Sequence, residues 1–250
     1  MNMHDAIKVY SVDDDLQTHY PREIFMYNEL RDRVAVVTGA GSGIGRAIAL
    51  CLGQQGCMLV LNDANSTGLE ETRELLELPE RVQLVVADVS LATTATKLAN
   101  TAIENFGKLD IWINNAARSH FGPLVDCSDE DWDAVMNVTL YGAFYGVRSA
   151  LRAMRHNPLP HRGCIINIAS GAALAGEEGL GAYGAAKAAL TNLTRTTAVE
   201  NAKSGIRCNV ILPGPIATPP MLAAARQSPG GIEGWAMQTV PGRLGEPEEI

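Results

Sequence analysis

Metal-site and disulfide patterns are missing from this sequence, and so is any long apolar run. The five cysteines form no C-x-x-C pair, and no histidines and cysteines stand together at metal-ligand spacing. Scattered cysteines in odd number predict reduced, mostly buried thiols and not a disulfide framework. No run approaches the roughly 18 apolar residues of a membrane span. We therefore predict no disulfide, no bound metal and no contact with a membrane.

Basic charge is also scarce. The 250 residues include 20 Lys and Arg against 28 Asp and Glu, which gives a net charge of −8. Recognition of nucleic acid needs a basic face, so this balance argues against a nucleic-acid partner and favours a small, weakly charged substrate. The N-terminal region is acidic at Asp13, Asp14 and Asp15, where a secretory or mitochondrial signal would be basic. The predicted location is the cytoplasm.

Short β-branched runs alternate with helical patterns from residue 31 onward. The candidate strands cover residues 34–37, 58–61, 82–87, 109–113, 164–168 and 207–212, and the candidate helices cover 43–56, 67–78, 91–106, 129–156 and 180–204. Such alternation, with nearly continuous apolar strands, predicts a parallel sheet covered by helices on both faces. No repeat or Pro/Ser-rich linker divides this body, so we predict one α/β domain at residues 31–250 after an N-terminal extension at 1–30.

The run TGAGSGIGRAIA follows the first candidate strand directly and opens the first helix. Gly39, Gly43 and Gly45 permit a tight turn and a close approach of the backbone to a pyrophosphate, whose charge suits the free N–H groups of a helix N-terminus. Asp63 ends the second strand, where a carboxylate can accept hydrogen bonds from an adenosine ribose. Alone, Asp63 could equally cap a turn. Together these elements predict a dinucleotide site.

Asp63 also bears on the choice of cofactor. A carboxylate beside the ribose repels a 2′-phosphate, and neither Ser42 nor Ala64 supplies a compensating base. Arg46 is nearby, but it lies inside the helix and could equally be a solvated surface residue. We therefore predict NAD in preference to NADP.

Tyr183 and Lys187 stand one helical turn apart, with Ser170 upstream. A tyrosine titrates near 10, so an acid or base of pKa about 7 needs roughly 4 kcal/mol of preferential stabilisation of the phenolate. A cation at about 4 Å in a medium of intermediate dielectric supplies roughly that amount. The pair therefore predicts an acid/base centre, although an Ala- and Gly-rich packing helix could carry the same spacing.

The motifs occur together and in order: T-G-x-x-x-G-x-G, then NNAA at residues 114–117, then Ser170, Tyr183 and Lys187. From about residue 31 to residue 250, the chain resembles the short-chain dehydrogenase/reductase family. The resemblance implies that Tyr183 gives or takes the proton of the reacting oxygen, which Ser170 holds. It further implies that Lys187 lowers the pKa of Tyr183 and binds the nicotinamide ribose, and that Asn137 completes a proton relay through water. Ser170 as a turn residue and Asn137 as a mid-helix polar residue are the structural alternatives.

The resemblance also implies the set of residues that bind the cofactor. The glycine loop and Asp63 would hold the pyrophosphate and ribose, Asp88 and Val89 would meet the adenine, and the PGPIAT run would lie near the nicotinamide. The full set is Gly39, Ser42, Gly43, Ile44, Gly45, Asp63, Asp88, Val89, Asn115, Ala116, Tyr183, Lys187, Pro213, Gly214, Ile216 and Thr218.

Two departures from the family pattern stand out. Ala117 replaces the glycine of the usual N-N-A-G, and the run GRLGEPEEI, which normally introduces a last helix and a seventh strand, is the end of this sequence. We expect a Rossmann-like, doubly wound sheet of order 3-2-1-4-5-6, with the seventh strand absent and the sixth left as an exposed apolar edge. A homo-oligomer, dimer or tetramer, is expected but weakened. The β-like run at residues 6–12 could cover such an edge.

Three functions are compatible with these features. The first is an NAD-dependent dehydrogenase that transfers a hydride between the cofactor and a secondary alcohol or ketone. The second is an NADPH-dependent 3-oxoacyl reductase, and the third is a catalytically silent nucleotide-binding protein. The segments expected to line the substrate site, residues 118–124, 171–182 and 215–240, are poor in charge. They predict a moderately apolar substrate, with His120 on the loop surface.

Overall fold

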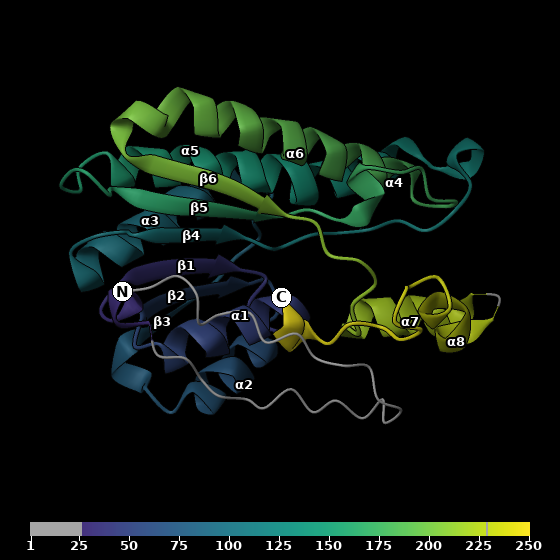
Figure 1. Ribbon diagram of the computed structural model, residues 1–250, viewed down its shortest axis with the longest axis horizontal. Helices are drawn as coiled ribbons and strands as arrows, with labels where there is room; N and C mark the ends of the chain where they lie inside the picture. Colours follow the sequence, from purple (N-terminus) through teal and green to yellow (C-terminus); the bar gives the residue numbers. More distant parts are fainter. Residues whose placement is uncertain (1–26, 229) are drawn as a thin grey trace, which may run out of the picture.

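A computed structural model describes residues 27–228 and 230–250 of the chain. Six parallel strands form one sheet in the order β3-β2-β1-β4-β5-β6 (Figure 1). They are β1 (Val34–Thr38), β2 (Met58–Asp63), β3 (Val82–Val86), β4 (Ile111–Asn114), β5 (Gly163–Ile168) and β6 (Ile206–Ile211). The predicted Rossmann-like order of a single α/β domain is confirmed. The proposed edge-covering run at 6–12 lies outside the described residues, as does the N-terminal extension up to residue 26.

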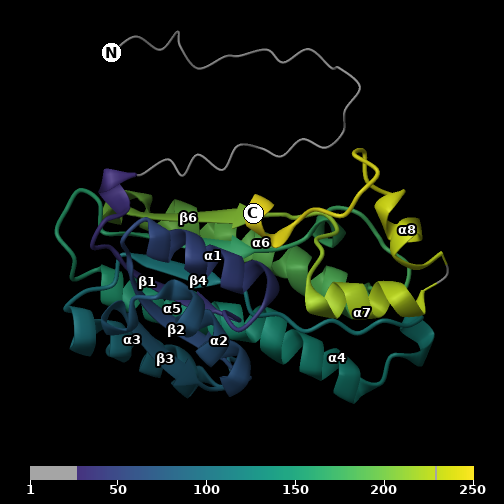
Figure 2. The same ribbon diagram turned by 90° about the horizontal axis from the view of Figure 1, so that it is seen from below.

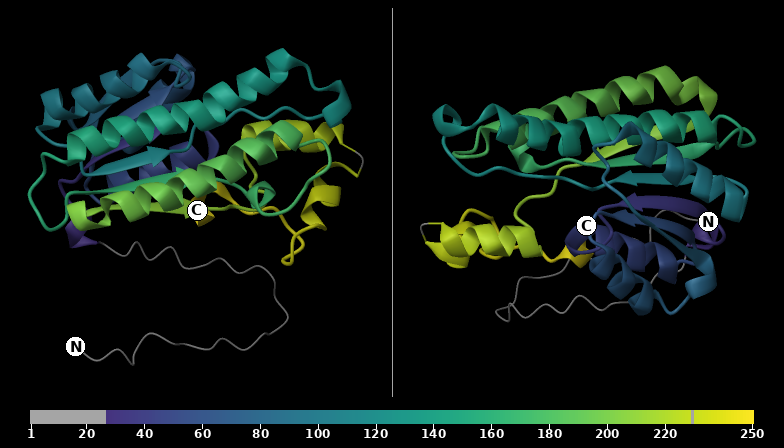
Figure 3. Two further views of the ribbon diagram at one scale, coloured as in Figure 1. Left: turned by 90° about the horizontal axis from the view of Figure 1, so that it is seen from above. Right: turned by 180° about the vertical axis from the view of Figure 1, so that it is seen from behind.

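Helices cover both faces of the sheet (Figures 1 and 3). One core packs side chains of α1 (Gly43–Gln54) and α2 (Ser66–Leu76) against β1 and β2. The other packs α3 (Ala92–Phe106) and α5 (Gly142–Met154) on the opposite face, where α6 (Gly181–Asn201) lies against β6. All five residues of β1 are buried, as expected for a central strand covered on both sides.

Two short helices lie beyond the carboxyl ends of the strands (Figure 2). These are α7 (Pro219–Gln227) and α8 (Gly231–Ala236), and the remaining short helical turns are η1 (Asn28–Leu30), η2 (Pro79–Arg81), η3 (Leu124–Asp126), η5 (Gly171–Ala173), η6 (Ala202–Ser204) and η7 (Pro247–Glu249). Because parallel strands all end at one edge of the sheet, α7 and α8 face the loops that follow them. None of the helices in the described part is long and apolar enough to span a membrane.

The region predicted as one helix over residues 129–156 is interrupted. It consists of α4 (Asp129–Met136), a π-helical turn at Asn137–Tyr141 (η4) and α5. Ser128 caps α4, since its hydroxyl accepts a hydrogen bond from the N–H of Asp131 at 3.1 Å. A π turn adds a residue to the helical repeat, which rotates the side chains that follow it, and such turns occur often at functional sites.

The sixth strand also differs from expectation. β6 is the edge of the described sheet, but the exposed positions on it are Arg207 and Asn209, while Ile206 and Cys208 are buried. The edge is therefore polar where its side chains meet solvent, and the predicted apolar edge is corrected. Polar and charged residues of this kind discourage edge-to-edge pairing.

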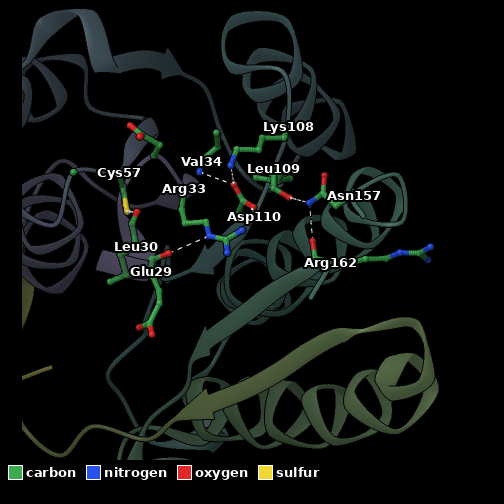
Figure 4. Close-up of polar contacts among 12 residues, drawn as sticks. Glu29, Leu30, Arg33, Val34, Cys57, Lys108, Leu109, Asp110, Asn157 and Arg162 are labelled. Atoms are coloured by element: carbon green, nitrogen blue, oxygen red, sulfur yellow. Dashed lines mark hydrogen bonds and ion pairs between the residues drawn. The ribbon is translucent and has the colours of Figure 1, made fainter. Parts of the chain in front are cut away.

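A buried carboxylate ties together the opposite, amino-terminal end of the strands (Figure 4). Asp110 accepts hydrogen bonds from the backbone N–H of Val34 at 2.9 Å and from Arg33 Nη1 at 2.9 Å. It also forms an ion pair with Lys108 at 3.1 Å. Nearby, Asn157 donates from Nδ2 to the carbonyl of Leu109 at 2.7 Å. These contacts join the start of β1 to the segment that leads into β4.

We predict that Asp110→Ala destabilises the protein by about 1–3 kcal/mol, because it leaves the buried N–H of Val34 without an acceptor. Asp110→Asn should cost less, since an amide oxygen can still accept that bond. Glu104→Ala, on the exposed face of α3, should stay within about 0.5 kcal/mol of wild type. Urea unfolding measures all three. Equal stability of Asp110→Ala and Glu104→Ala would contradict the role given to Asp110.

Candidate active site

The glycine loop joins the end of β1 to the start of α1. Gly39 and Gly43 have φ angles of 65° and 51°, in the left-handed region that favours glycine. A Cβ on Gly45 would stand 2.0 Å from the carbonyl oxygen of Gly39. Only glycine at position 45 lets the loop fold back onto the helix this closely, so the sequence pattern directly produces the turn.

The NNAA run lies beside this loop. Asn115 Nδ2 donates to the carbonyls of Thr38 and Gly39 at 3.0 and 3.1 Å, and its backbone N–H donates to Thr38 Oγ1 at 3.0 Å. A Cβ on Gly39 would lie 2.9 Å from Cα of Ala116. Asn115 and Ala116 therefore support the glycine loop from the side of β4.

Two carboxylates stand at the ends of the neighbouring strands β2 and β3. Asp63 Oδ2 accepts a hydrogen bond from the backbone N–H of Gly41 at 3.0 Å. Asp88 is exposed and accepts one from the N–H of Ser90 at 2.8 Å, while Val89 lies against Gly142. This placement sets Asp63 at the mouth of the glycine loop and Asp88 one strand further along the edge.

A cavity of about 260 Å³ opens at the carboxyl edge of the sheet. Its walls come from the loops after β1, β4, β5 and β6 and from α6, α7 and α8. The lining residues are Ile44, Asn115, Ala117, Ser119, Phe121, Ile168, Ala169, Ser170, Gly171, Glu177, Leu180, Tyr183, Lys187, Pro213, Gly214, Pro215, Ile216, Thr218, Pro220, Met221 and Trp235. All three segments expected to line a substrate site contribute to it.

The cavity divides the predicted cofactor residues into two groups. Those of the PGPIAT run, which are expected near the nicotinamide, line it together with Ser170, Tyr183 and Lys187: they are Pro213, Gly214, Ile216 and Thr218. Ile44 of the glycine loop and Asn115 line it as well. The others, Gly39, Ser42, Gly43, Gly45, Asp63, Asp88, Val89 and Ala116, are not part of its lining. They continue along the ends of β1, β2 and β3 and the start of α1 and α5. A Cβ on Gly43 would lie 2.8 Å from Thr218 Cγ2, so the two groups adjoin.

Ser170, Tyr183 and Lys187 meet at the floor of the cavity. Ser170 follows β5, and the other two lie on α6. Lys187 is only 2% exposed, and its Nζ donates to the carbonyl of Ile168 at 2.5 Å. The same Nζ lies 5.5 Å from the centre of the Tyr183 ring. The structure thus brings the predicted acid/base pair together and adds Ile168 as the anchor of the lysine.

The electrostatics of this pair differ from the prediction. Burial raises the pKa of Tyr183; a side-chain hydrogen bond with Ser170 opposes that effect, and the carboxylate of Glu177 adds to it. Burial also lowers the pKa of Lys187 to about 7. Both shifts favour the uncharged form, because a buried charge loses hydration. The expected lowering of the tyrosine pKa by Lys187 is therefore not present in the protein alone.

Asn137 is not brought to the cavity. It is exposed at the first position of the π turn and is not among the lining residues. Thr139, two residues on, is fully buried, and its Oγ1 accepts from the N–H of Arg118 at 3.0 Å and donates to the carbonyl of Arg118 at 2.9 Å. The π turn thus directs Thr139 inward, toward the loop that carries Ala117 and Ser119. A relay role for Asn137 gains no support from its position.

Several residues at the mouth of the cavity carried no sequence motif. Phe121 and Trp235 pack edge to face with ring centres 6.4 Å apart, which joins the loop after β4 to α8. Glu177 and Met221 also line the cavity. His120 points elsewhere, since its Nδ1 lies 3.6 Å from Asp131 Oδ1 and the residue is absent from the lining, as predicted. The signal in the sequence for these residues was the low charge of the segments 118–124, 171–182 and 215–240.

Comparison with known proteins places this fold and site in a family. A family model described as enoyl-(acyl carrier protein) reductase matches residues 39–250. A short-chain dehydrogenase/reductase, astE, from Aspergillus oryzae is 36% identical over 225 residues, which cover 88% of this chain and 85% of the relative. The 3-oxoacyl-[acyl-carrier-protein] reductase FabG of Thermotoga maritima is 32% identical over 223 residues, 88% of each chain.

Solved structures agree with these relatives. The crystal structure of levodione reductase superposes with a TM-score of 0.83 at 33% identity and covers 88% of both chains. A short-chain dehydrogenase from Mycobacterium smegmatis gives a TM-score of 0.76 at 33% identity, over 92% of this chain and 86% of that one. The glycine loop, the cavity and these likenesses agree: the chain belongs to the short-chain dehydrogenase/reductase family, whose members are oxidoreductases that use a nicotinamide cofactor on alcohol and keto groups.

Proposed function

We propose that this protein is an NAD-dependent oxidoreductase that interconverts a secondary alcohol and its ketone, with Tyr183 as the general acid/base. The observation that carries the proposal is the single cavity in which Ser170, Tyr183 and Lys187 face the residues expected around a nicotinamide. The glycine loop fits such a cofactor, because it folds back closely onto the start of α1, and the backbone N–H groups at a helix N-terminus suit a pyrophosphate. When bound, the nicotinamide supplies or accepts the hydride.

The chain's own residues handle the proton and the orientation of the substrate. Ser170 donates a hydrogen bond to the reacting oxygen and holds it beside the Tyr183 hydroxyl, which donates its proton as a ketone becomes an alcohol. The raised pKa of Tyr183 keeps the phenol protonated at neutral pH, the form needed for that step. In the reverse direction a protonated Lys187 stabilises the phenolate, and its pKa of about 7 makes that charge available near neutrality.

The preference for NAD is supported by the surroundings of the glycine loop. Asp63 holds its carboxylate against the N–H of Gly41, where the 2′-phosphate of NADP would meet like charge. Arg46, the nearest base considered from the sequence, is already committed. Its guanidinium bonds to Thr72 Oγ1 at 3.0 Å and to Glu71 Oε2 at 2.7 Å. It is therefore poorly placed to compensate for Asp63.

A second candidate, a 3-oxoacyl reductase using NADPH, draws on the relative from Thermotoga maritima that bears that activity in its name. The cavity offers little for it. Its two charged lining residues are Glu177 and Lys187, and Lys187 is bonded to the carbonyl of Ile168. The third possibility, a catalytically silent protein, conflicts with membership of a family of oxidoreductases.

We also propose that the protein is a homo-oligomer. An apolar hollow of about 340 Å³ lies on the outer side of η4, α5 and α6, lined by Leu140, Tyr141, Phe144, Tyr145 and Leu193. Tyr141 and Phe144 are 47% and 38% exposed. Clustered exposed aromatic residues on adjacent helices favour burial against another subunit. Residence in the cytoplasm, and the domain boundary near residue 31, stay predictions from the sequence.

Tyr183→Phe should lower kcat by about 10²- to 10⁴-fold, because it removes the acid/base while keeping the ring. Binding of NADH, followed by fluorescence, should change little. Tyr27→Phe, an exposed tyrosine outside both the cavity and the apolar hollow, serves as the matched control and should keep full turnover with a secondary alcohol and NAD. Residual activity of Tyr183→Phe above about a hundredth of wild type would remove Tyr183 from the proposed role.

Asp63→Ser tests the choice of cofactor. Wild type should give a higher kcat/KM with NADH than with NADPH, and the variant should narrow that ratio by about tenfold or more, since removal of the like charge relieves roughly 1.4 kcal/mol of repulsion. Asp133→Ser, on the exposed face of α4, should leave the ratio unchanged. A wild-type preference for NADPH would instead favour the second candidate.

The low pKa of Lys187 predicts a pH dependence of stability. A lysine in the unfolded chain titrates near 10.4, whereas burial sets this one at about 7. Between those values the unfolded chain holds the additional proton, so the free energy of unfolding rises with pH. Relative to Lys187→Met, cofactor-free wild type should gain roughly 1 kcal/mol per pH unit from pH 7 to 10 in urea unfolding, with no gain below pH 6. If the free energy of unfolding changed with pH in the same way for wild type and Lys187→Met, the low pKa assigned to the buried lysine would be wrong.

A further inference from the structure

The carbonyl groups of the glycine loop, residues 38–42, all have protein donors. Asn115 Nδ2 binds the first two, on Thr38 and Gly39, at 3.0 and 3.1 Å. This amide comes from the loop after β4, so it secures the side of the glycine loop that faces the middle of the sheet. It accounts for only part of the loop.

Two side chains and one amide hold the other three carbonyls. Thr72 Oγ1 lies 2.9 Å from the carbonyls of both Ala40 and Gly68, and Arg46 Nη2 donates to the carbonyl of Gly41 at 2.5 Å. The backbone N–H of Arg46 donates to the carbonyl of Ser42 at 3.2 Å. Thr72 is fully buried. Helix α2 therefore holds the loop by hydrogen bonds on the side away from the cavity.

Arg46 links α1, the loop and α2 through a single guanidinium. In addition to Gly41, it donates to the carbonyl of Gly68 at 3.2 Å and to Thr72 Oγ1 at 3.0 Å, and it forms an ion pair with Glu71 at 2.7 Å. A Cβ on Gly68 would stand 2.7 Å from the carbonyl oxygen of Gly41. The guanidinium thus fills a narrow space between α1, the loop and α2. Its planar, forked set of donors is one that a lysine cannot reproduce.

The opposite, N–H side of the loop is left open. Within residues 27–228 and 230–250, no protein acceptor binds the backbone N–H groups of residues 42–45. Successive free N–H groups at the start of a helix of twelve residues favour an anion. The two features act together. The carbonyls are hydrogen-bonded on one side of the loop while the N–H groups are free on the other, and a carbonyl that turned toward the N–H side would repel a phosphate.

We propose that Arg46 and Thr72 are positioning residues of the pyrophosphate site: they hold the carbonyls of Gly41 and Ala40 toward α2 so that the N–H groups of residues 42–45 face the phosphates. This proposal rests on the cofactor site of the proposed function. Arg46 acts by geometry and not by charge, since Glu71 neutralises its guanidinium at 2.7 Å.

Calorimetric titration with NADH, ADP-ribose and adenosine tests the proposal. Arg46→Met should weaken binding of NADH and ADP-ribose about tenfold or more, the equivalent of one or two lost hydrogen bonds, and change adenosine binding less than about threefold. Arg46→Lys should be nearly as weak as Arg46→Met, because it keeps the charge and loses the fork. Arg73→Met, which breaks the exposed pair with Glu70 on the same helix, is the matched control and should bind all three ligands like wild type.

Thr72→Val provides a second, independent variant in case Arg46→Met folds poorly. It should also weaken the binding of ADP-ribose relative to wild type. Recovery of wild-type affinity by Arg46→Lys would overturn the proposal in favour of a charge effect. An equal loss of affinity for adenosine and for ADP-ribose would overturn it, because it would indicate a general defect of the binding site. Failure of wild type to bind NADH would instead overturn the proposed function, so the two failures are distinguishable.

Discussion

Parallel pairing of all six strands is the constraint on which the rest of this structure depends. Strands that run the same way end at the same edge, so segments that are far apart in the sequence converge there. They are the glycine loop after β1, the NNAA run after β4, Ser170 after β5 and the PGPIAT run after β6. Crossover helices must then cover both faces, which buries β1 completely. The cavity is a consequence of this topology, and its floor on α6 is set by the packing of that helix against β6.

The same burial that assembles the site also controls its charges. Lys187 and Tyr183 both shift toward their neutral forms, because the helix that carries them packs into the protein interior. The pair therefore carries less charge in the protein alone than the same two side chains would in water. Ser170 opposes the shift of the tyrosine, whereas Glu177 at the mouth adds to it. The pKa of the tyrosine thus depends on its burial, on Ser170 and on Glu177.

Alternating apolar runs predicted the parallel sheet, because they are a local signal, whereas its strand order and the convergence of Ser170, Tyr183 and Lys187 were implied by the resemblance to the family. The sequence did not predict the π turn at Asn137–Tyr141, since a helical pattern over 129–156 carries no mark of one extra residue in a turn. For that reason Thr139, and not Asn137, points inward. The direction of the tyrosine pKa was also missed, because desolvation depends on packing that spacing alone does not reveal. The four partners of Arg46 come from α2 and the loop, and only the fold brings them together.

The chemistry of the cavity mouth bears on which substrates the proposed function admits. Phe121, Met221 and Trp235 provide an apolar wall, and burial of apolar surface there favours a hydrophobic body next to the reacting carbon. Glu177 is the one acidic residue among the lining residues, and the one lining cation, Lys187, is held on the carbonyl of Ile168. An anionic substrate would therefore meet a carboxylate with no free cation to offset it. For the proposed function, a neutral or basic ketone therefore suits this site better than a carboxylate or a phosphorylated acyl carrier.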